Sequence, residues 1–417
     1  MAEKLSTEPY KGVRDFYPED MAVQRHIFDT WSHTAESFGF ERYDASVLEP
    51  SELYKSKGVE NEELVNDQTY TFTDRGDREV TLRPEMTPTV ARMIAGRHKE
   101  LPFPARWYSI PNLFRYERSQ RGRVREHWQL NCDLFGAEDQ LAADVEMIAL
   151  AYQSLINFGA TEEMFSIRVN DRREMKEFYY SLGVIDEESI TQVTRLNDRF
   201  HKIERAEYME ELRQIVPGAA EAILEFVEKS EQTENAVTKA LNAIGINNVQ
   251  IDRSLARGFD YYTGTIFEIF DNDPKNNRSM LGGGRYDDLT FLFGDERIGG
   301  VGFGMGDVTM RDFLETHDLL PNLKASASLI VVPTDTKFNL DGEKVAMAFR
   351  ASGVSTLVDI SNRKLGKKVT NAAHSGAGYL LVVGEDEIAR DEFVLKNLAD
   401  GTEISGSLTD LAKQIAS

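Results

Sequence analysis

The most constraining feature of this 417-residue sequence is a strict two-residue alternation between positions 128 and 134. Apolar and polar side chains alternate there, with Trp128, Leu130, Cys132 and Leu134 set against Gln129, Asn131 and Asp133. Successive side chains of a β-strand point to opposite faces, so the segment predicts a strand with one apolar and one polar face. Gln129 and Asp133 then share the polar face about 13 Å apart, at a rise of ~3.3 Å per residue. Each is either a plain surface residue or, backed by an apolar strand, part of a site.

Hydrophobic periodicity separates β-rich from helical regions. Helices are expected at 19–39 and 138–157, and two strands should surround a basic loop between 107 and 135. Residues 170–247 are mostly charged with helical periodicity, which predicts a helical insertion between two β-rich halves of one domain. Beyond a linker at 319–322, strands alternate with helices, which predicts a small α/β domain with a mostly parallel sheet.

Composition limits the class of protein. The net charge of −22 argues against a protein that coats nucleic acid non-specifically. From Ala325 onward the chain is nearly neutral, with 10 basic and 12 acidic residues, and contains the compact basic cluster Arg363, Lys364, Lys367 and Lys368. The only cysteine is Cys132, so no intramolecular disulfide or cysteine-based metal site is expected. With no secretion signal and no apolar run that could span a bilayer, we expect a cytoplasmic protein without a membrane partner.

A run of arginines marks the segment 115–125, which holds five arginines in eleven residues. Guanidinium groups at this density suit a polyphosphate or a nucleic-acid backbone, and Glu117 could tether or read a base. Arg115 lies two residues before Glu117, on the same face of a regular strand. The alternative is a solvated hairpin tip.

The turn at 81–88 places Glu85 and Thr87 between two prolines, Pro84 and Pro88. The prolines rigidify the turn, so the carboxylate and hydroxyl could hold an ammonium group. The alternative is an ordinary helix start, with Thr87 as the cap, Pro88 at the first helical position and Glu85 exposed.

The segment 255–265 combines a cation, a carboxylate and two phenols beside two glycines, just before a strand expected at 266–270. Arg257 offers a rigid donor fork for a carboxylate or phosphate, and the hydroxyls of Tyr261 and Tyr262 could orient a small polar ligand. This pattern indicates a pocket for a small anionic molecule. The alternative is a turn with a surface ion pair between Arg257 and Asp260.

Two segments, 281–288 and 299–306, are dense in glycine. Glycine lets the backbone approach a ligand closely, but neither segment has the pattern of a Walker loop or a dinucleotide fingerprint. The seven histidines form no pair at a useful metal-ligand spacing, so no metal site is predicted. His127 is expected to pack or to lie in a loop rather than to bind a ligand.

These segments, in this order, resemble class II aminoacyl-tRNA synthetases, and within them the histidyl-tRNA synthetase family. The helix after residues 12–18 and the strand ending at Pro50 resemble the first class II signature. The second signature is similar to the segment made of Phe114–Glu117, the basic loop and His127–Gln129. The segment 257–262 resembles the histidine-specific signature, and 359–368 with 384–387 resembles the anticodon-binding domain. The resemblance implies an α+β catalytic core built on an antiparallel sheet with flanking helices, a helical insertion and a C-terminal α/β anticodon-binding-like domain. The expected parts are 1–169 and 248–322 for the catalytic domain, 170–247 for the insertion and 325–417 for the C-terminal domain.

The resemblance also implies roles for individual residues. Arg115 and Arg257 would be catalytic, with Arg257 bridging the histidine carboxylate and the α-phosphate of ATP. The histidine site would comprise Glu85, Thr87, Arg115, Gln129, Asp133, Arg257, Tyr261 and Tyr262. The ATP site would comprise Arg115, Glu117, Arg123, Gly304 and Arg257. The tRNA would contact Arg118, Gln120, Arg123 and Arg125 and, in the C-terminal domain, Arg363, Lys364 and Lys367.

The implied reaction joins histidine and ATP into histidyl-adenylate, with Mg²⁺ accompanying ATP, and then transfers the histidyl group to tRNA in a homodimer. Orientation and charge stabilisation would carry the reaction, with no protein nucleophile. One position departs from the family pattern: Thr309 stands where an arginine that packs on ATP is expected. Arg311 lies about 200° further around a helix and is a poor substitute. Thr309 favours the alternative of an inactive, histidine-sensing regulatory subunit of histidine biosynthesis, whereas Arg115, Glu117 and Arg257 favour the enzyme.

Overall fold

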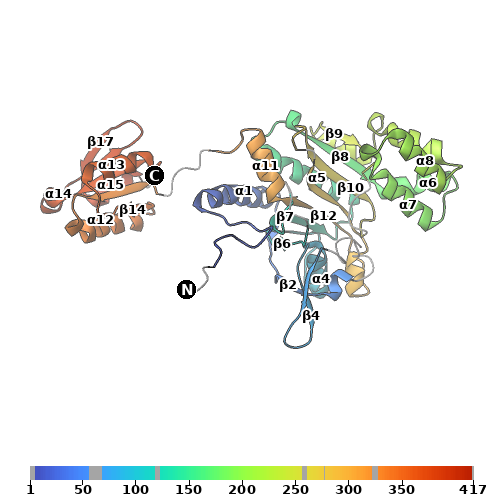
Figure 1. Cartoon of the computed structure of the whole chain (residues 1–417), viewed down its shortest axis with the longest axis horizontal. Helices are drawn as coiled ribbons and strands as arrows, with labels where there is room; N and C mark the ends of the chain where they lie inside the picture. Colours follow the sequence, from blue (N-terminus) through green and yellow to red (C-terminus); the bar gives the residue numbers. More distant parts are fainter. Residues whose placement is uncertain are drawn as a thin grey trace. The chain divides into compact units, whose positions relative to one another are not determined.

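The computed structural model describes residues 5–55, 68–117, 123–255, 261–276, 278–321 and 327–415. The chain divides into two compact units, Met1–Leu320 and Pro321–Ser417, drawn from blue to red along the sequence in Figure 1.

The first unit is built on a large, mainly antiparallel sheet. In the described part of the chain its spatial order is β1 (Glu41–Arg42), β5 (Ala105–Ser109), β7 (Glu126–Phe135), β12 (Gly300–Gly306), β11 (Ser279–Arg285), β10 (Thr265–Asp271), β8 (Phe165–Asp171) and β9 (Val249–Ile251), with β6 (Asn112–Phe114) paired to one end of β7. Only the outer pairs, β1–β5 and β8–β9, are parallel among these. The expected antiparallel core with flanking helices is confirmed.

Helices cover the apolar face of this sheet. They are α1 (Pro18–Ser37), α5 (Gln140–Asn157) and α11 (Asp307–Thr316). Helix α1 begins with proline, whose fixed φ suits a first turn, and is followed by Gly39 at φ +79°, a conformation that favours glycine. Helix α5 is capped by Asp139, whose side chain accepts from the backbone N–H of Ala142.

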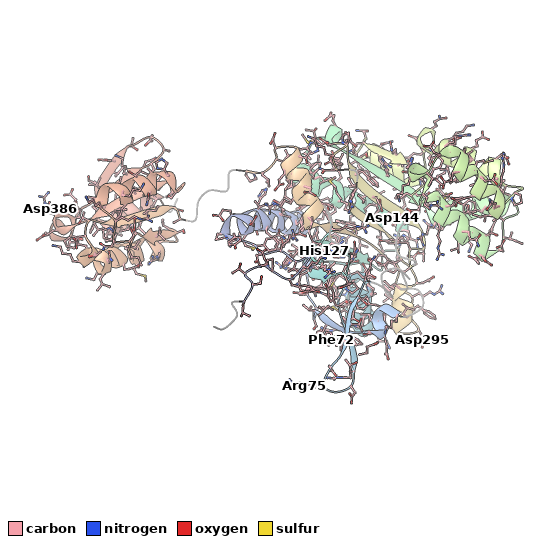
Figure 2. All side chains as sticks on the ribbon, viewed as in Figure 1. Phe72, Arg75, His127, Asp144, Asp295 and Asp386 are labelled. Atoms are coloured by element: carbon pink, nitrogen blue, oxygen red, sulfur yellow. The ribbon has the colours of Figure 1, made fainter. Side chains whose placement is uncertain are left out.

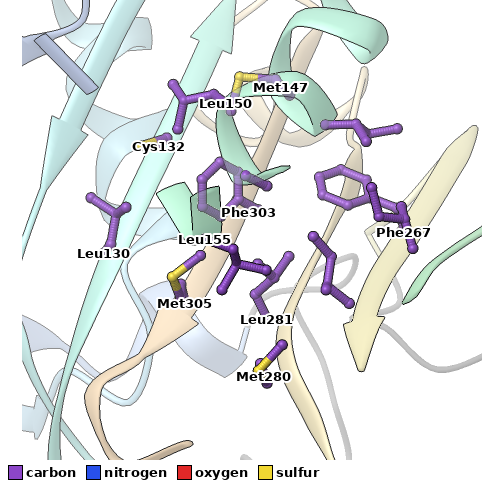
Figure 3. Close-up of a cluster of buried hydrophobic side chains, with 14 of the residues drawn as sticks. Leu130, Cys132, Met147, Leu150, Leu155, Phe267, Met280, Leu281, Phe303 and Met305 are labelled. Carbon is purple, nitrogen blue, oxygen red and sulfur yellow. The ribbon is translucent and has the colours of Figure 1, made fainter. Parts of the chain in front are cut away.

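The core lies between α5 and the sheet. Figure 3 shows Met147, Leu150 and Leu155 packed over Cys132 of β7 and Phe303 of β12. Burial of a large apolar side chain contributes roughly 1.5–3 kcal/mol, so the alternating apolar positions of β7 and β12 fix which sheet face meets the helices. The polar positions of the same strands are thereby turned to the opposite face.

That opposite face carries a small three-stranded sheet and a helix. The strands β2 (Leu48–Pro50), β4 (Glu79–Leu82) and β3 (Tyr70–Thr73) are antiparallel, and α4 (Thr87–Arg97) follows them along the chain after the turn at Arg83–Met86. Val90, Ala91 and Ile94 of α4 pack with Tyr261 and Tyr286 in a second apolar cluster. The β3–β4 hairpin projects from the unit, with Phe72 and Arg75 along it (Figure 2).

The segment expected to be helical is helical. It contains α6 (Arg172–Ser181), α7 (Glu187–Asn197), α8 (Arg205–Ile215), α9 (Ala220–Glu228) and α10 (Ala236–Ala243). Helices α6–α9 surround an apolar cluster of their own, whereas α10 contributes Val237 and Leu241 to the main core. The last of these helices is therefore part of the main domain's packing.

The second unit has a five-stranded mixed sheet in the order β14 (Thr356–Val358), β13 (Leu329–Pro333), β15 (Tyr379–Val383), β16 (Phe393–Asn397) and β17 (Glu403–Gly406), counted over the described residues. Its helices are α12 (Asn339–Ala351), α13 (Leu365–His374), α14 (Glu385–Arg390) and α15 (Leu408–Ile415). The prediction of a mostly parallel sheet is wrong for the second half of the sheet, because β15–β16 and β16–β17 are antiparallel. Strand β16 follows the short helix α14, which does not carry the chain over the sheet as a crossover to a parallel strand must.

Among the described residues, no helix is both long and apolar enough to cross a bilayer.

Candidate functional site

A cavity of about 250 Å³ opens on the polar face of the large sheet. Its walls come from the end of β6, from β7, β10, β11 and β12, and from the start of α11. The lining residues are Arg115, Glu117, Arg123, Val124, His127, Gln129, Glu268, Ser279, Met280, Leu281, Gly282, Gly304, Gly306, Val308 and Thr309. The cavity therefore unites the arginine-rich segment, the alternating strand and both glycine-dense segments, which are far apart in sequence.

Glycine keeps this face of β12 open. Gly304 lies opposite Asn131 in the pairing of β12 with β7, and a Cβ built on it would lie 2.1 Å from the side-chain nitrogen of Gln129. A Cβ on Gly302 would lie 2.5 Å from a carboxylate oxygen of Asp133. These glycines thus give room to the two polar side chains that the alternation of β7 turns to this face.

Arg115 stands at the mouth of the cavity just after β6. Its Nε donates to the carbonyl of Pro84 at 2.9 Å, which fixes the side chain and joins the arginine-rich segment to the proline-flanked turn. Glu117 forms an ion pair of 3.0 Å with Arg123 on the same wall. Two guanidinium groups on one wall favour a phosphate-bearing ligand, since Arg binds phosphate oxygens with its donor fork.

Glu85 is a buried carboxylate beside this wall. Only 3% of the residue is exposed, and burial raises the pKa of its carboxyl to about 8, although the positive charge of Arg115 acts in the opposite direction. One carboxylate oxygen accepts from Tyr261 at 2.9 Å, and the other has no hydrogen-bond partner among the described residues. Because a buried polar atom is normally paired, this oxygen is suited to accept from a bound ammonium group.

A helix does start at this turn with Pro88 in its first turn, but the alternative is wrong in giving Thr87 as the cap and Glu85 as exposed. The residue before the first turn of α4 is Met86, no side chain caps the helix, and Thr87 is its first residue. Thr87 and Glu85 are both buried. The prolines of the turn therefore hold two polar side chains inside the protein.

Asp133 forms a second buried carboxylate, on the same face of β7 as Gln129. The Tyr286 hydroxyl donates to one of its oxygens, and the other has no partner among the described residues. Burial raises the pKa of this carboxyl to about 7. A donor such as an imidazole N–H would satisfy the unpaired oxygen.

Three tyrosine rings lie around these two carboxylates. Tyr261 packs edge-on against Tyr262 with centroids 5.1 Å apart and against Tyr286 at 5.8 Å, and Tyr262 lies 6.3 Å from Tyr286. The expected members Glu85, Asp133, Tyr261 and Tyr262 therefore form one cluster beside the cavity. Tyr286, which the sequence interpretation did not single out, completes it; its place after three consecutive glycines was the available signal.

His127 and Glu268 are further residues that the sequence interpretation missed. Both line the cavity; whether His127 binds a ligand, which the sequence interpretation did not expect, stays a prediction. Burial, followed by the charges of Arg115 and Arg14, lowers the pKa of His127 to about 3, so the imidazole is neutral there. Figure 2 labels His127 within the first unit. Its position one residue before Trp128, on an alternating strand, gave no indication that it lines a cavity.

Thr309 occupies the cavity wall where the resemblance called for arginine. Its single hydroxyl hydrogen is shared between the carbonyls of Met280 and Gly306, both at 3.2 Å, which fixes the side chain on the wall. Arg311 pairs with Asp20 at 3.1 Å and with Glu315 at 2.8 Å. Its guanidinium is engaged by these carboxylates, and Arg311 is not among the cavity-lining residues.

Asp307, the first residue of α11, lies in sequence between the cavity-lining residues Gly306 and Val308. This buried carboxylate accepts from Arg14 at 2.8 Å, from Gln24 at 2.9 Å and from the backbone N–H of Trp128 at 3.0 Å. It thereby ties the N-terminal segment and α1 to β7 and α11. A hydrogen-bonded charge at such a junction holds the strands that carry the site in register.

Several expected site residues lie outside the described part of the chain. They are Arg257, with the neighbouring Asp260, and Arg118 and Gln120 of the basic loop. Arg125 is described: its guanidinium lies 4.0 Å from the centroid of the Tyr116 ring and donates to the Tyr10 hydroxyl at 3.1 Å.

The basic cluster of the second unit is of two kinds. Arg363, Lys364 and Lys367 are exposed around the start of α13. Lys368 is only 2% exposed and donates to the carbonyls of Pro333 at 3.2 Å and Asp359 at 3.0 Å. Lys368 thus binds the ends of two strands together, and the other three cations of the cluster are exposed to solvent.

Comparison with known protein families agrees with this division. The family described as histidyl-tRNA synthetase matches residues 12–307, and the anticodon binding domain family matches residues 328–417.

Similar proteins were found over nearly the whole chain. A histidine–tRNA ligase from Leptospira biflexa is 39% identical over 99% of this chain and 98% of its own length, and one from Thermoplasma volcanium is 36% identical over 98% of both. The solved histidyl-tRNA synthetase of Nostoc sp. PCC 7120 has a TM-score of 0.80 and 25% identity, covering 99% of each chain. A Bacillus halodurans chain described as an ATP phosphoribosyltransferase regulatory subunit/histidyl-tRNA synthetase has a TM-score of 0.70 at 21% identity, which shows a shared fold alone.

Proposed function

The chain belongs to the histidyl-tRNA synthetase family, and we propose that its cavity and the adjoining carboxylate cluster are where histidine is activated. The protein is a histidine–tRNA ligase: it couples ATP to the attachment of L-histidine to tRNA through histidyl-adenylate. The assignment of individual residues below is our proposal.

The observation that carries the assignment is the pair of buried carboxylates, Glu85 and Asp133, each with one oxygen that has no partner among the described residues. Histidine has two groups that such oxygens suit, the α-ammonium and an imidazole N–H. Glu85 binds the ammonium together with Thr87 and Gln129, because Glu85 lies beside Arg115 and the cavity. Asp133 accepts from the imidazole, with Tyr262 at the other side of the ring and Tyr261 closing the pocket.

The cavity itself holds ATP. Arg115 contacts the α-phosphate, Arg123 the phosphates, and Glu117 the adenine, with the backbone at Gly304 close to the nucleotide. The described residues contain no group of three or more potential metal ligands. In this proposal Mg²⁺ accompanies ATP, as part of the substrate.

The chemistry needs placement and charge, without a covalent bond to the protein. A carboxylate oxygen of histidine attacks the α-phosphorus, the bond to the bridging oxygen breaks, and pyrophosphate leaves. Arg115 and Arg257 neutralise the charge that develops on the phosphorus oxygens. A terminal hydroxyl of tRNA then attacks the carbonyl of the adenylate, transfers its proton to a base and releases AMP.

Thr309 implies that the nucleotide is held without the usual arginine. The Thr309 hydroxyl donates to two backbone carbonyls, and the Arg311 guanidinium is paired with Asp20. The neutral His127 on the cavity wall is the aromatic surface available for a flat base.

Binding of tRNA falls to the basic residues outside the cavity. Arg118, Gln120, Arg123 and Arg125 meet the acceptor end, and Arg363, Lys364 and Lys367 meet the anticodon region. The acidic remainder of the protein then repels other polyanions and confines the RNA to these surfaces.

We also propose that the enzyme is a cytoplasmic homodimer. Exposed apolar side chains support the assembly: Leu48 and Phe72 on the small sheet are 46% and 48% exposed, and Phe291 and Leu292 are 48% and 41% exposed. Apolar side chains exposed in neighbouring strands and turns mark interaction surfaces. Analytical ultracentrifugation tests it: a species near the mass of one chain, about 47 kDa, would contradict the dimer.

The deciding experiment is exchange of labelled pyrophosphate into ATP by the purified protein, without tRNA. We expect exchange with L-histidine and with no other amino acid, which would show that Thr309 is compatible with adenylate formation. Absence of exchange despite measurable histidine binding would indicate the histidine-sensing regulatory subunit.

A further inference from the structure

Arg172, the first residue of α6, joins the helical insertion to the segment that carries the tyrosines of the histidine pocket. Its Nη1 donates to the carbonyl of Tyr262 at 3.0 Å, and its backbone N–H donates to the carbonyl of Gly264 at 3.1 Å. The guanidinium carbon also lies 5.9 Å from the centroid of the Tyr262 ring. One residue at the start of the insertion therefore holds the backbone on both sides of Thr263.

The helical insertion also contacts the chain at Arg253, just after β9. The backbone N–H of Arg253 donates to the Ser230 hydroxyl at 3.1 Å, and its guanidinium donates to the carbonyl of Phe226 at 2.9 Å. That guanidinium lies 3.7 Å from the centroid of the Phe226 ring, which stacks on Phe178 of α6 at 3.7 Å. The insertion is thus hydrogen-bonded to the chain at two places: α9 bonds to Arg253, and α6 bonds to Tyr262.

On its other side, Tyr262 belongs to the carboxylate cluster. Its ring contacts Tyr261, which donates to Glu85, and Tyr286, which donates to Asp133. A shift of the Tyr262 backbone is therefore transmitted to the hydrogen-bond donors of both carboxylates. Packed aromatic rings transmit such a shift because a close-packed interior has little room to absorb it.

We propose that Arg172 is a positioning residue that couples the helical insertion to the histidine pocket by fixing the backbone of Tyr262. The proposal rests on the assignment of Tyr262 and the two carboxylates to histidine binding. Coupling of this kind is reciprocal: histidine stabilises α6, and a partner that moves α6 changes the affinity for histidine by the same factor. The insertion then serves amino-acid activation even when no tRNA is bound.

The test compares Arg172→Ala and Arg172→Lys with Arg213→Ala, a matched control in which another arginine of the insertion loses its ion pair with Glu221. Titration calorimetry gives the affinities for L-histidine and ATP, and hydrogen exchange followed by mass spectrometry reports the protection of α6. In the wild type and the control, histidine should slow exchange in α6. In Arg172→Ala, histidine affinity should fall roughly 10-fold, as expected for losing a hydrogen bond from a charged donor, with ATP affinity unchanged and the protection of α6 lost.

Arg172→Lys keeps the positive charge and a hydrogen-bonding ammonium group in place of the guanidinium, so it should recover part of both effects and guards against a folding defect in the alanine variant. Wild-type histidine affinity and wild-type protection of α6 in both variants would overturn the coupling while leaving the proposed function standing. A wild-type protein that supports no histidine-dependent exchange of pyrophosphate and binds no histidine would overturn both.

Discussion

Tyr261 donates a hydrogen bond of 2.9 Å to Glu85, although 176 residues separate the two in the sequence. The bond joins the turn between β4 and α4 to the segment before β10, and it leaves the second oxygen of Glu85 unpaired among the described residues. The carboxyl is thus held in a fixed orientation while its burial keeps the pKa at about 8.

This pKa predicts proton release on histidine binding. Near neutral pH the Glu85 carboxyl of the free protein is mainly protonated, and the ammonium group of histidine requires the ionised form. Histidine affinity should therefore rise as pH increases towards about 8, by up to about tenfold per pH unit, and the proton should leave to the buffer. Calorimetry in two buffers of different ionisation enthalpy counts these protons.

Glu85→Gln supplies the comparison for that measurement. It should bind histidine more weakly and release fewer protons, and the remaining pH dependence should belong to Asp133 and to histidine itself. Equal proton release by the variant and the wild type would show that Glu85 does not ionise on binding.

Gly304→Ala should abolish histidine-dependent pyrophosphate exchange with little loss of stability. The added methyl group would meet the Gln129 side chain at 2.1 Å, so Gln129 must leave its position in the site. Gly282→Ala is the matched control on the same cavity wall, because its nearest neighbour would be Glu268 at 3.6 Å, an ordinary contact. Histidine affinity measured for both variants should fall only in the first; equal losses would mean that Gln129 is not the cause.

Asp144→Ala should lower the free energy of unfolding by about 3 kcal/mol, the low end of the range for breaking a buried ion pair, because Arg285 keeps a second partner, Asp287, at 3.0 Å. The side chains of Asp144 and Arg285 are each 2% exposed, and the distance from Arg285 Nη2 to Asp144 Oδ1 is 2.5 Å. Asp144 also accepts from the hydroxyl of Thr265. Figure 2 shows Asp144 within the first unit. Urea unfolding followed by circular dichroism measures the change. Glu221→Ala, which removes an exposed ion pair, should leave stability nearly unchanged; similar effects of the two changes would contradict the importance of burial.

Removal of the exposed cations of the second unit should affect the binding of tRNA alone. Combined Arg363→Ala, Lys364→Ala and Lys367→Ala should raise the KM for tRNA and flatten its dependence on salt, because fewer phosphate contacts release fewer counterions. Pyrophosphate exchange, which needs no tRNA, should be unchanged. Lys368→Ala should instead destabilise the unit by removing the donors to Pro333 and Asp359, and an unaltered melting temperature would contradict that structural role.

Local patterns in the sequence were sufficient for much of the fold. The alternation around Gln129 and Asp133 predicted a strand with one polar face, and the periodicities at 19–39 and 138–157 predicted α1 and α5 within a few residues. These predictions succeeded because side-chain direction in a strand or helix repeats with a fixed period, so burial of one face leaves a record in neighbouring residues. The mixed sheet of the second unit was not predictable in the same way, since strand direction depends on how the chain crosses the sheet.

The cluster of buried carboxylates and tyrosines depended on contacts between distant segments. Tyr286 meets Asp133, His127 faces the cavity, and Arg172 reaches Tyr262 only because strands remote in sequence become neighbours in one sheet. Residue type and spacing indicated the chemistry of Glu85, Asp133 and Arg115, since carboxylates and guanidinium groups suit few ligands. Burial raises the pKa of both carboxyls, and one oxygen of each has no partner within the part of the chain that the structure describes. Such burial arises from packing in three dimensions and has no local signature in the chain.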